Sequence, residues 1–291
     1  MNFCGNVTRL TNLMDIIVNS SSNELPEGSI PIKEYGNFYC NLYATLHDTS
    51  EYMPIADLLR KYHGLEGKWL VVSLINWQAS HNDAMITASF DNLKLTDEES
   101  RLWFNDFKEF LALDNIDLYY HNKDIWLLRS DKLPPITAKN VYNMHNQSIM
   151  PALHQLDKTL YWQKFITESQ MFLSSNILNK GRALEYNING VWVWGAGVLP
   201  KLSNKKIVCN DKESFELAKL LSTNVEMAAD ISYAKYNVIL FNNFGVKESD
   251  LLCKYLKKHT VNWYWNNIAY NKKSKNLMRR CMELFTRTRS I

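Results

Sequence analysis

The chain has 291 residues, of which 46% are hydrophobic and 22% are charged, and its formal net charge is +3. This length and composition are typical of a globular protein with one large core or two modest ones. Asp15 interrupts the one apolar stretch near the N-terminus, and no run of about eighteen apolar residues occurs, so neither secretion nor a membrane span is expected. The five cysteines form no CxxC pair, which favours reduced thiols in the cytoplasm over disulfides or a zinc site.

The chain before residue 190 has the pattern of a small mixed domain. Thr96 and Glu99 form a capping box, and the apolar residues that follow lie on one helical face, which predicts an amphipathic helix. Apolar, β-branched runs on either side of this helix predict strands. These strands are expected at residues 68–75, 84–90, 116–120 and 124–128.

From Gly190 onward, strands and helices alternate. Strands are expected at residues 190–194 (GVWVW), 205–209 (KKIVC), 236–241 (YNVILF) and 261–265 (VNWYW). The first runs into a glycine turn, and helices are expected to follow the others from near Asp211, near Ser249 and at the C-terminus. Strands separated by helices predict right-handed crossovers and a mostly parallel sheet. Ligands of such sheets bind beyond the carboxyl ends of the strands, where Gly195 and Gly197 are expected.

Residues 168–200 resemble the bacterial RpfE-type regulatory proteins. The matching residues are Glu168, Gln170, Met171, Asn179, Arg182, Asn189, Trp192, Trp194, Gly195 and Gly197. Asn176 and Ile177 depart from the His-Pro of that pattern, and two residues are missing between Arg182 and Asn189. The resemblance extends over roughly residues 66–200, and it implies a regulatory protein.

A more distant resemblance is to the archaeal-type cofactor-independent phosphoglycerate mutases of the alkaline phosphatase superfamily. They also have an Asn-x-x-Arg segment followed by Asn and a glycine turn, beside an inserted α+β domain. Trp194 stands where these mutases have a substrate-binding arginine. Such an enzyme would need a nucleophilic serine and two divalent metals held by clustered Asp and His. No such cluster is evident in the sequence, so we expect no metal and no cofactor.

These patterns predict an α/β protein with a mostly parallel sheet flanked by helices, a degenerate alkaline-phosphatase-like fold, and an inserted α+β subdomain. Residues 1–65 are expected to begin the core domain, residues 66–189 to form the inserted subdomain, and residues 190–291 to complete the core. The first 65 residues are the least informative. Helices are expected there at Arg9–Val18 and Ile55–Tyr62.

We predict a ligand pocket between the subdomains, with the glycine turn as one wall. Glycines allow close approach of the main chain, and the forked guanidinium of Arg182 matches a carboxylate or a phosphate. Asn179 and Arg182 would share a helical face if that stretch is helical. The candidate ligand-binding residues are His81, Asn82, Asp83, Asn179, Arg182, Asn189, Trp194, Gly195 and Gly197.

Each of these residues also has a structural interpretation. The segment 77–85 (WQASHNDAM) reads equally well as a polar connection between two strands. Trp192 and Trp194 lie on one face of a strand, where core packing is the default, although a tryptophan at the strand end can also face a ligand. Arg182 could be an exposed arginine without a ligand contact.

The function expected from the sequence is that of a cytoplasmic bacterial regulatory protein, without catalysis, that binds a small anionic ligand or a protein partner. The alternative is a phosphomutase or phosphoesterase. A third hypothesis is nucleic-acid binding, because residues 271–291 hold seven Lys or Arg against one Glu and follow several aromatic residues. The solvated face of a terminal helix explains this charge more simply, so nucleic acid is not the partner we expect. The sequence does not indicate an oligomeric state.

Overall fold

A computed structural model of the protein describes residues 14–22, 24–47, 51–79, 83–227, 236–242, 244 and 260–273. The chain divides into two compact units. The first unit combines both ends of the chain, up to His47 and from Leu202, and the second is the continuous segment Asp48–Lys201. None of the described helices has the length and apolar character needed to cross a membrane.

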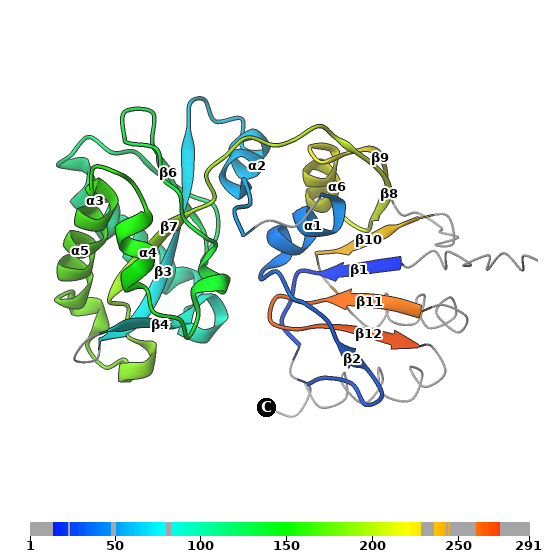
Figure 1. The fold of residues 1–291 in the computed structure, drawn as a ribbon, viewed down its shortest axis with the longest axis horizontal. Coiled ribbons are helices and arrows are strands. Elements are labelled where there is room, and N and C mark those ends of the chain that lie inside the picture. Colours follow the sequence, from blue (N-terminus) through cyan, green and yellow to red (C-terminus); the bar gives the residue numbers. More distant parts are fainter. Residues whose placement is uncertain are drawn as a thin grey trace, which may run out of the picture. The chain divides into compact units, whose positions relative to one another are not determined.

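The first unit contains a seven-stranded sheet among its described residues, and five neighbouring strands of this sheet are parallel (Figure 1). Two antiparallel strands extend one edge. In spatial order the strands are β2 (Ile30–Pro31), β12 (Ala269–Lys273), β11 (Thr260–Tyr264), β1 (Met14–Val18), β10 (Val238–Phe241), β8 (Ser203–Cys209) and β9 (Ser222–Met227). The predicted α/β class with a mostly parallel sheet is therefore confirmed.

Strand β1 occupies the centre of the parallel sheet, between β10 and β11. The helix predicted at Arg9–Val18 is wrong for residues 14–18, and residues 9–13 lie outside the described part of the chain. The short apolar run of β1 fits a helix as well as a strand, and pairing on both edges decides for the strand. Ile16 and Ile17 have no exposed surface because the two faces of this strand are both covered.

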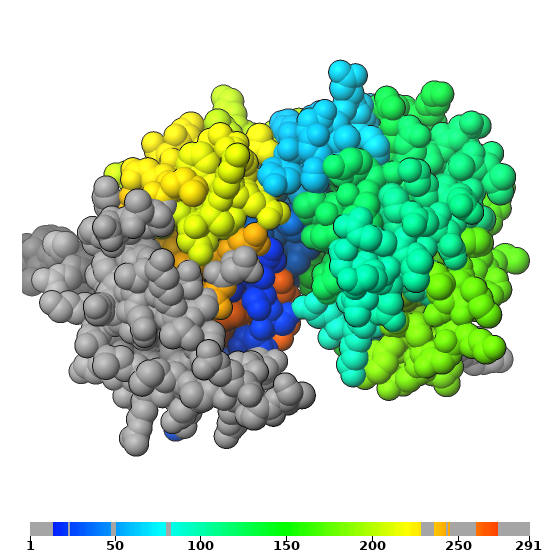
Figure 2. Space-filling model, turned by 180° about the vertical axis from the view of Figure 1, so that it is seen from behind, coloured from blue at the N-terminus to red at the C-terminus, as the bar shows by residue number. Residues whose placement is uncertain are grey.

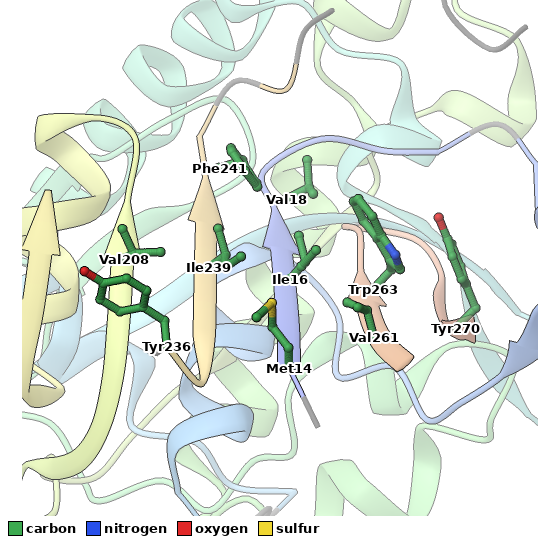
Figure 3. Close-up of a cluster of buried hydrophobic side chains, with 10 residues drawn as sticks. All are labelled: Met14, Ile16, Val18, Val208, Tyr236, Ile239, Phe241, Val261, Trp263 and Tyr270. Atoms are coloured by element: carbon green, nitrogen blue, oxygen red, sulfur yellow. The ribbon is translucent and has the colours of Figure 1, made fainter. Parts of the chain in front are cut away.

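Alternate side chains of these strands form the core on one face of the sheet. Figure 3 shows ten of them from β1, β8, β10, β11, β12 and the residue Tyr236 before β10. Helix α1 (Phe38–Leu46) packs against β1, and α6 (Lys212–Lys219) packs against β8 and β9. The predicted N-cap Asp211 accepts a hydrogen bond from the amide of Ser214. Figure 2 shows the segment of α6 and β9 in yellow on the surface of this unit.

The C-terminal part of the first unit departs from the predicted order. The strand predicted at 261–265 is followed directly by β12, its antiparallel neighbour, and β12 includes residues 271–273 of the predicted basic segment. Lys272 is buried there. The helices predicted near Ser249 and after residue 273, together with the rest of the basic segment, lie outside the described residues.

The second unit has a mostly antiparallel sheet in which the long strand β3 (Trp69–Ala79) is central. It pairs with β4 (Ala84–Ser89), β6 (Trp126–Arg129) and β7 (Gly190–Trp194), and β6 pairs with β5 (Leu118–Tyr120). The helices are α2 (Ile55–Tyr62), α3 (Asp97–Ala112), α4 (Met150–Gln155) and α5 (Tyr161–Ser174), with 3-10 turns at Phe90–Leu93, Val141–Met144, Ile177–Asn179 and Leu184–Tyr186.

The helices of the second unit pack on this sheet as the sequence pattern indicates. The capping box of Thr96 and Glu99 is present at the start of α3. Helix α3 lies beside α5, and the rings of Phe110 and Phe172 stack between them at 4.5 Å (Figure 1). Helix α2 packs against β3 and has the bounds predicted from the sequence.

Strand β7 does not belong to the parallel sheet, which corrects the prediction for residues 190–194. It is antiparallel to β3, with Val193 opposite Val72, and it lies in the second unit. All five of its residues are buried, and a strand buried on both faces has the same continuous apolar sequence in either kind of sheet. The glycine turn therefore follows an antiparallel strand, and the rule for carboxyl ends of parallel strands does not place a ligand there.

Candidate functional site

The turn after β7 is tightly packed against the start of the second unit. Gly195 has a φ of +80°, and its carbonyl accepts a hydrogen bond from the amide of Ala56 at 3.1 Å. A Cβ on Gly195 would lie 2.9 Å from Cγ2 of Val71, and one on Gly197 would lie 3.1 Å from Cβ of Pro54. Only glycine combines this backbone conformation with such close approach. The two glycines thus fasten the turn to β3 and to the start of α2.

Asp57 connects helix α2 to the chain that follows this turn. Its carboxylate accepts from the amide of Leu199 at 2.9 Å and from the guanidinium of Arg60 at 2.7 Å, and it pairs with Lys61 at 3.2 Å. Burial alone would raise the pKa of Asp57, but the hydrogen bonds from Leu199, Arg60 and Lys61 outweigh it and hold this pKa below its usual value. Asp57 is therefore a charged anchor of the site.

A pocket of about 570 Å³ opens beside the turn, within the second unit. Its walls come from α2, the start of β3, the loop after β6 and the turn itself. In Figure 2 the residues around α2 are the light-blue atoms. The lining residues are Asp57, Arg60, Lys61, Gly67, Lys68, Trp69, Leu70, Ser130, Asp131, Leu133, Pro134, Pro135, Ile136, Ala196, Gly197 and Val198.

Cationic side chains outnumber carboxylates in this pocket, three to two. Arg60 and Lys61 share Asp57, while Asp131 is bound at 2.7 Å by Arg129, which does not line the pocket. Lys68 is exposed at the pocket wall. The hydrogen bonds from Arg129 and from the Lys68 amide, together with the charges of Arg129 and Lys68, hold the pKa of Asp131 below its usual value, so this carboxylate is charged. The lining of the pocket therefore carries one net positive charge.

Of the three residues predicted from segment 77–85, only Asp83 is described, because His81 and Asn82 lie outside the described residues. Asp83 Oδ1 accepts hydrogen bonds from the amide of Ala84 at 2.7 Å and from the hydroxyl of Ser148 at 2.6 Å. These bonds hold the start of β4 beside the loop before α4. Asp83 does not line the pocket at the glycine turn.

The two predicted asparagines bond to the backbone. Asn179 donates to the carbonyls of Leu173 and Ile188 and accepts from the amide of Ile188, all between 2.8 and 3.0 Å. Asn189 donates to the carbonyl of Trp77 and accepts from its amide, both at 2.8 Å. Each side chain thus replaces a backbone partner next to β7, and neither lines the pocket.

Arg182 also makes structural contacts. Its guanidinium donates to the carbonyls of Tyr186 and Leu93 and pairs with Glu99 at 3.3 Å, and its side chain is only 12% exposed. The expected helical face with Asn179 is absent, because the 3-10 turn ends at Asn179. Arg182 lines neither the pocket at the turn nor a second pocket of about 370 Å³ that includes Lys139 and Gln155.

Trp194 has no exposed surface, and its indole N–H donates to the hydroxyl of Ser73 at 3.1 Å. Trp192 is equally buried and donates to the carbonyl of Lys139. The structure therefore places Trp194 in the core, in agreement with the packing interpretation. Among the predicted residues that the structure describes, Gly197 is the one that lines the pocket at the turn.

The donor set in the described part of the chain does not fit the two metal ions of a phosphoglycerate mutase. No group of three or more His, Cys, Asp or Glu among those residues could hold a metal ion. Cys40 and Cys209 are buried free thiols whose pKa values are raised by burial. The arrangement at the turn, with an apolar floor and fixed cations, is suited to binding an anion.

The sequence reasoning missed Asp57, Arg60, Lys61 and Lys68. The first three had a readable signal, because an acidic residue followed three and four positions later by Arg and Lys forms ion pairs on a helix, and α2 was predicted. Lys68 had no local signal. Its position at the pocket depends on the pairing of β3 with β6 and β7, which brings together segments that are far apart in the sequence.

Comparison with known proteins gives little further information. No protein-family model matches the chain, and no curated protein matches it. The solved structure of a cofactor-independent phosphoglycerate mutase from Thermoplasma acidophilum DSM 1728 is similar over 90% of both chains, with 12% sequence identity and a TM-score of 0.33. A TM-score of this size supports no conclusion about the site or the activity.

Proposed function

We propose that this protein binds a small organic anion in the pocket beside the Gly195–Gly197 turn and serves a regulatory, non-catalytic role. The observation that carries the proposal is the pairing of an apolar wall with an exposed lysine. Trp69, Leu70 and the 133–136 loop line one part of the pocket, and Lys68 stands among them. A ligand with an apolar body and one anionic group would satisfy both.

The dimensions and electrostatics of the pocket support this ligand class. Pockets for small molecules usually have volumes of about 300–1,000 Å³, and most of their walls are apolar with a few polar groups. The pocket lining carries one net positive charge, because Arg60 and Lys61 share the single carboxylate of Asp57, while Asp131 faces both Lys68 and Arg129. The hydrogen bonds of Asp57 and of the glycine turn fix the walls, which lowers the entropic cost of binding.

The regulatory part of the proposal rests on the resemblance of residues 66–200 to the RpfE-type proteins. A ligand that binds only the folded second unit stabilises it, and in this way ligand concentration can control availability for a partner. A protein partner is the other occupant that the resemblance suggests.

The test is isothermal titration calorimetry of the full-length protein with phenyl phosphate, inorganic phosphate and benzyl alcohol. We expect phenyl phosphate to bind most tightly, because it alone offers both an apolar ring and an anion. The variant Lys68→Ala should weaken phenyl phosphate binding by roughly tenfold, since a hydrogen bond to a charged group contributes about 1.5 kcal/mol at the lower end of its range. Equal affinity for all three compounds would contradict the proposal.

Lys132→Ala is the matched control. Lys132 is exposed in the same loop as Asp131 but does not line the pocket. It should leave the affinity for phenyl phosphate unchanged, because it removes the same charge from the surface of the unit without touching the site. An equal loss in both variants would mean that general surface charge, rather than the pocket, attracts the anion.

Phosphotransfer is the competing hypothesis, and it has a direct assay. Incubation with 3-phosphoglycerate and manganese should give no conversion to the 2-phospho isomer if the protein is non-catalytic. Turnover that disappears on chelation would overturn the non-catalytic role. Such turnover would leave anion binding at Lys68 to be judged by the calorimetry alone.

A further inference from the structure

In the first unit, an asparagine lies just beyond the end of each of the three central strands, and the three asparagines stand at the same height along the sheet. Ile17 of β1 is in register with Leu240 of β10 and Tyr264 of β11. Side chains alternate between the faces of a sheet, so residues two positions further along lie on the same face. Val18, Phe241 and Trp263 belong to the core cluster drawn in Figure 3, so by this alternation their neighbours in sequence face the other side of the sheet. The residues that follow in register are Asn19, Asn242 and Asn266.

These side chains form a hydrogen-bonded row, the amide row. Asn266 Nδ2 donates to Asn19 Oδ1 at 3.3 Å, and Asn19 Nδ2 donates to Asn242 Oδ1 at 2.6 Å. Asn242 Nδ2 donates to a carboxylate oxygen of Glu213 in α6 at 3.0 Å. A carboxylate only accepts hydrogen bonds, so Asn242 must direct its NH₂ group toward Glu213. Glu213 thus fixes the orientation of all three amides.

The loops around the amide row are tied to each other. The Asn266 amide donates to the carbonyl of Ser20 at 2.9 Å. The side chain of Asn267 accepts from the amide of Ser22 and donates to its carbonyl, both at 2.8 Å. The loops that follow β1 and β11 are therefore held together, and polar groups held in place before binding lose little entropy when a ligand arrives.

The amide row lies where parallel α/β sheets usually bind ligands. Asn19, Asn242 and Asn266 stand at the carboxyl ends of β1, β10 and β11. β1 lies between β10 and β11, so the chain passes from one side of β1 to the other after β10. Ligands bind in the crevice at such a reversal of strand order.

The chemistry of the amide row favours a neutral ligand with several hydroxyl groups. Each amide retains one N–H and further acceptor capacity after the bonds within the row, and Asn266 Oδ1 is buried without a hydrogen-bond partner. A hydroxyl group both donates and accepts hydrogen bonds, so it can bond to the remaining N–H groups and to the remaining oxygens of the row. Among the described residues, the charged group that is hydrogen-bonded to the row is the carboxylate of Glu213. Its negative charge disfavours an anionic ligand. We propose that the amide row is a binding site for a sugar or polyol.

The test uses the full-length protein labelled with ¹⁵N-asparagine and titrated separately with D-glucose, D-ribose and myo-inositol. We expect at least one of them to shift a few side-chain NH₂ signals saturably, with a millimolar or tighter Kd. These signals should be those lost or displaced in the variant Asn19→Ala. This variant should also weaken the binding roughly tenfold, because it removes the amide at the centre of the row.

Asn224→Ala is the matched control. Asn224 lies in β9 of the same sheet, is exposed, and donates to the carbonyl of Asn204. It should leave sugar binding unchanged. Lys68→Ala should also leave it unchanged, since Lys68 belongs to the other unit. The anion proposal and the sugar proposal can therefore fail independently, because each is decided by its own ligand and its own variant.

Three outcomes would overturn the proposal. The first is that none of the three compounds shifts a side-chain amide of the wild-type protein at about 50 mM, well above a millimolar Kd. The second is binding that Asn19→Ala leaves unchanged. The third is that calcium or inorganic phosphate shifts the same signals while the sugars do not, which would make the row an ion site. If Asn19→Ala fails to fold, the wild-type titration with its ¹⁵N readout decides by itself.

Discussion

The guanidinium of Arg182 connects the 3-10 turn at 184–186, the end of the 90–93 turn and the start of α3. It does so through Tyr186, Leu93 and Glu99, and its side chain is largely buried. A forked group with five donors is suited to this task, just as it is to binding a phosphate. From the sequence, Arg182 is therefore equally suited to a ligand site and to a structural junction, and the fold shows the second role.

Arg182→Ala is therefore expected to lower stability and leave anion binding unchanged. The free energy of unfolding should fall by about 1–3 kcal/mol, because two partly buried carbonyls lose a charged donor. Urea denaturation measures this, and calorimetry with phenyl phosphate measures the binding. Arg101→Ala, which removes an exposed arginine paired with Asp97, is the control and should have little effect on stability. Lost binding with full stability would restore Arg182 as a ligand residue.

Gly195 has both a left-handed backbone and no room for a Cβ. Gly195→Ala should cost about 1–2 kcal/mol for the backbone conformation and more for the contact with Val71. Gly181→Ala separates the two effects, because Gly181 has a φ of +90° and a Cβ added there would meet nothing within 4 Å. We expect Gly195→Ala to be clearly the more destabilising in urea unfolding. Equal losses would show that the turn shifts to accommodate the methyl group.

Asp57→Asn tests the anchor of the pocket. Losing a charged acceptor of three hydrogen bonds should lower the free energy of unfolding by about 1–3 kcal/mol near neutral pH. The pKa of Asp57 is lowered in the folded protein, so its contribution is present above the unfolded value of about 3.9 and is lost as the pH falls below it. The wild type and the variant should therefore converge in stability on acidification. A constant difference down to about pH 3 would exclude this carboxylate as the cause.

At the scale of elements, the sequence predicted those whose signals are local. The capping box at Thr96 located α3, and Asp211 located α6. The pattern predicts a helix at β1 because four apolar residues in a run of five do not distinguish the helical period from the strand period. The pairing that makes it a strand is with β10 and β11, which are more than two hundred residues away. The prediction for β7 is wrong for the same reason, because a single sequence does not encode locally which strand pairs with which.

The residues of the site divide in the same way, into those with a local sequence signal and those placed by long-range contacts. The glycine turn could be predicted, because Gly195 and Gly197 adopt backbone conformations that favour glycine. The polar residues grouped with it by proximity in sequence are instead hydrogen-bonded to the backbone, as Asn179 and Asn189 show. Lys68 reaches the pocket through sheet pairing, and the amide row depends on strand register. Tertiary contacts of this kind leave no periodic trace in the sequence.

A histidine pair joins two elements of the second unit. His63, at the end of α2, and His121, in the turn between β5 and β6, are linked by a 2.8 Å hydrogen bond between Nε2 and Nδ1. The hydroxyl of Tyr119 contacts the other nitrogen of His63. Burial lowers the pKa of both histidines, and with the charge of His63 it lowers that of His121 to about 3. The pair is therefore neutral in the folded protein near pH 7.

Acid should destabilise the protein through this pair. A histidine with a lowered folded pKa contributes stability above the unfolded value of about 6.5, and this is lost as the pH falls from there toward the folded value. For His121 the loss is at most about 1.4 kcal/mol per pH unit. In His121→Gln the decrease in unfolding free energy between about pH 7 and 5 should be smaller. His154→Gln, at an exposed position in α4, is the control. Identical pH profiles of His121→Gln and the wild type would contradict this account.

At the scale of the whole molecule, the two units differ in how the chain builds them. The second is one continuous segment with its own sheet and helices, Asp48–Lys201. The first needs both ends of the chain, because β1 from the N-terminal part lies between β10 and β11 from the C-terminal part. Removing β1 would leave two unpaired inner edges and expose the apolar faces that it covers (Figure 3).

We therefore expect a fragment of residues 48–201 to fold alone and a fragment of residues 202–291 to remain unfolded. The first should unfold cooperatively in urea and bind phenyl phosphate like the full chain, because the whole pocket is contained in it. The second should gain dispersed amide signals in NMR spectra only when residues 1–47 are supplied as a peptide, since that peptide carries the central strand. A folded 202–291 fragment without the peptide would show that β10 and β11 pair directly, and that β1 is an insertion into a sheet that already exists.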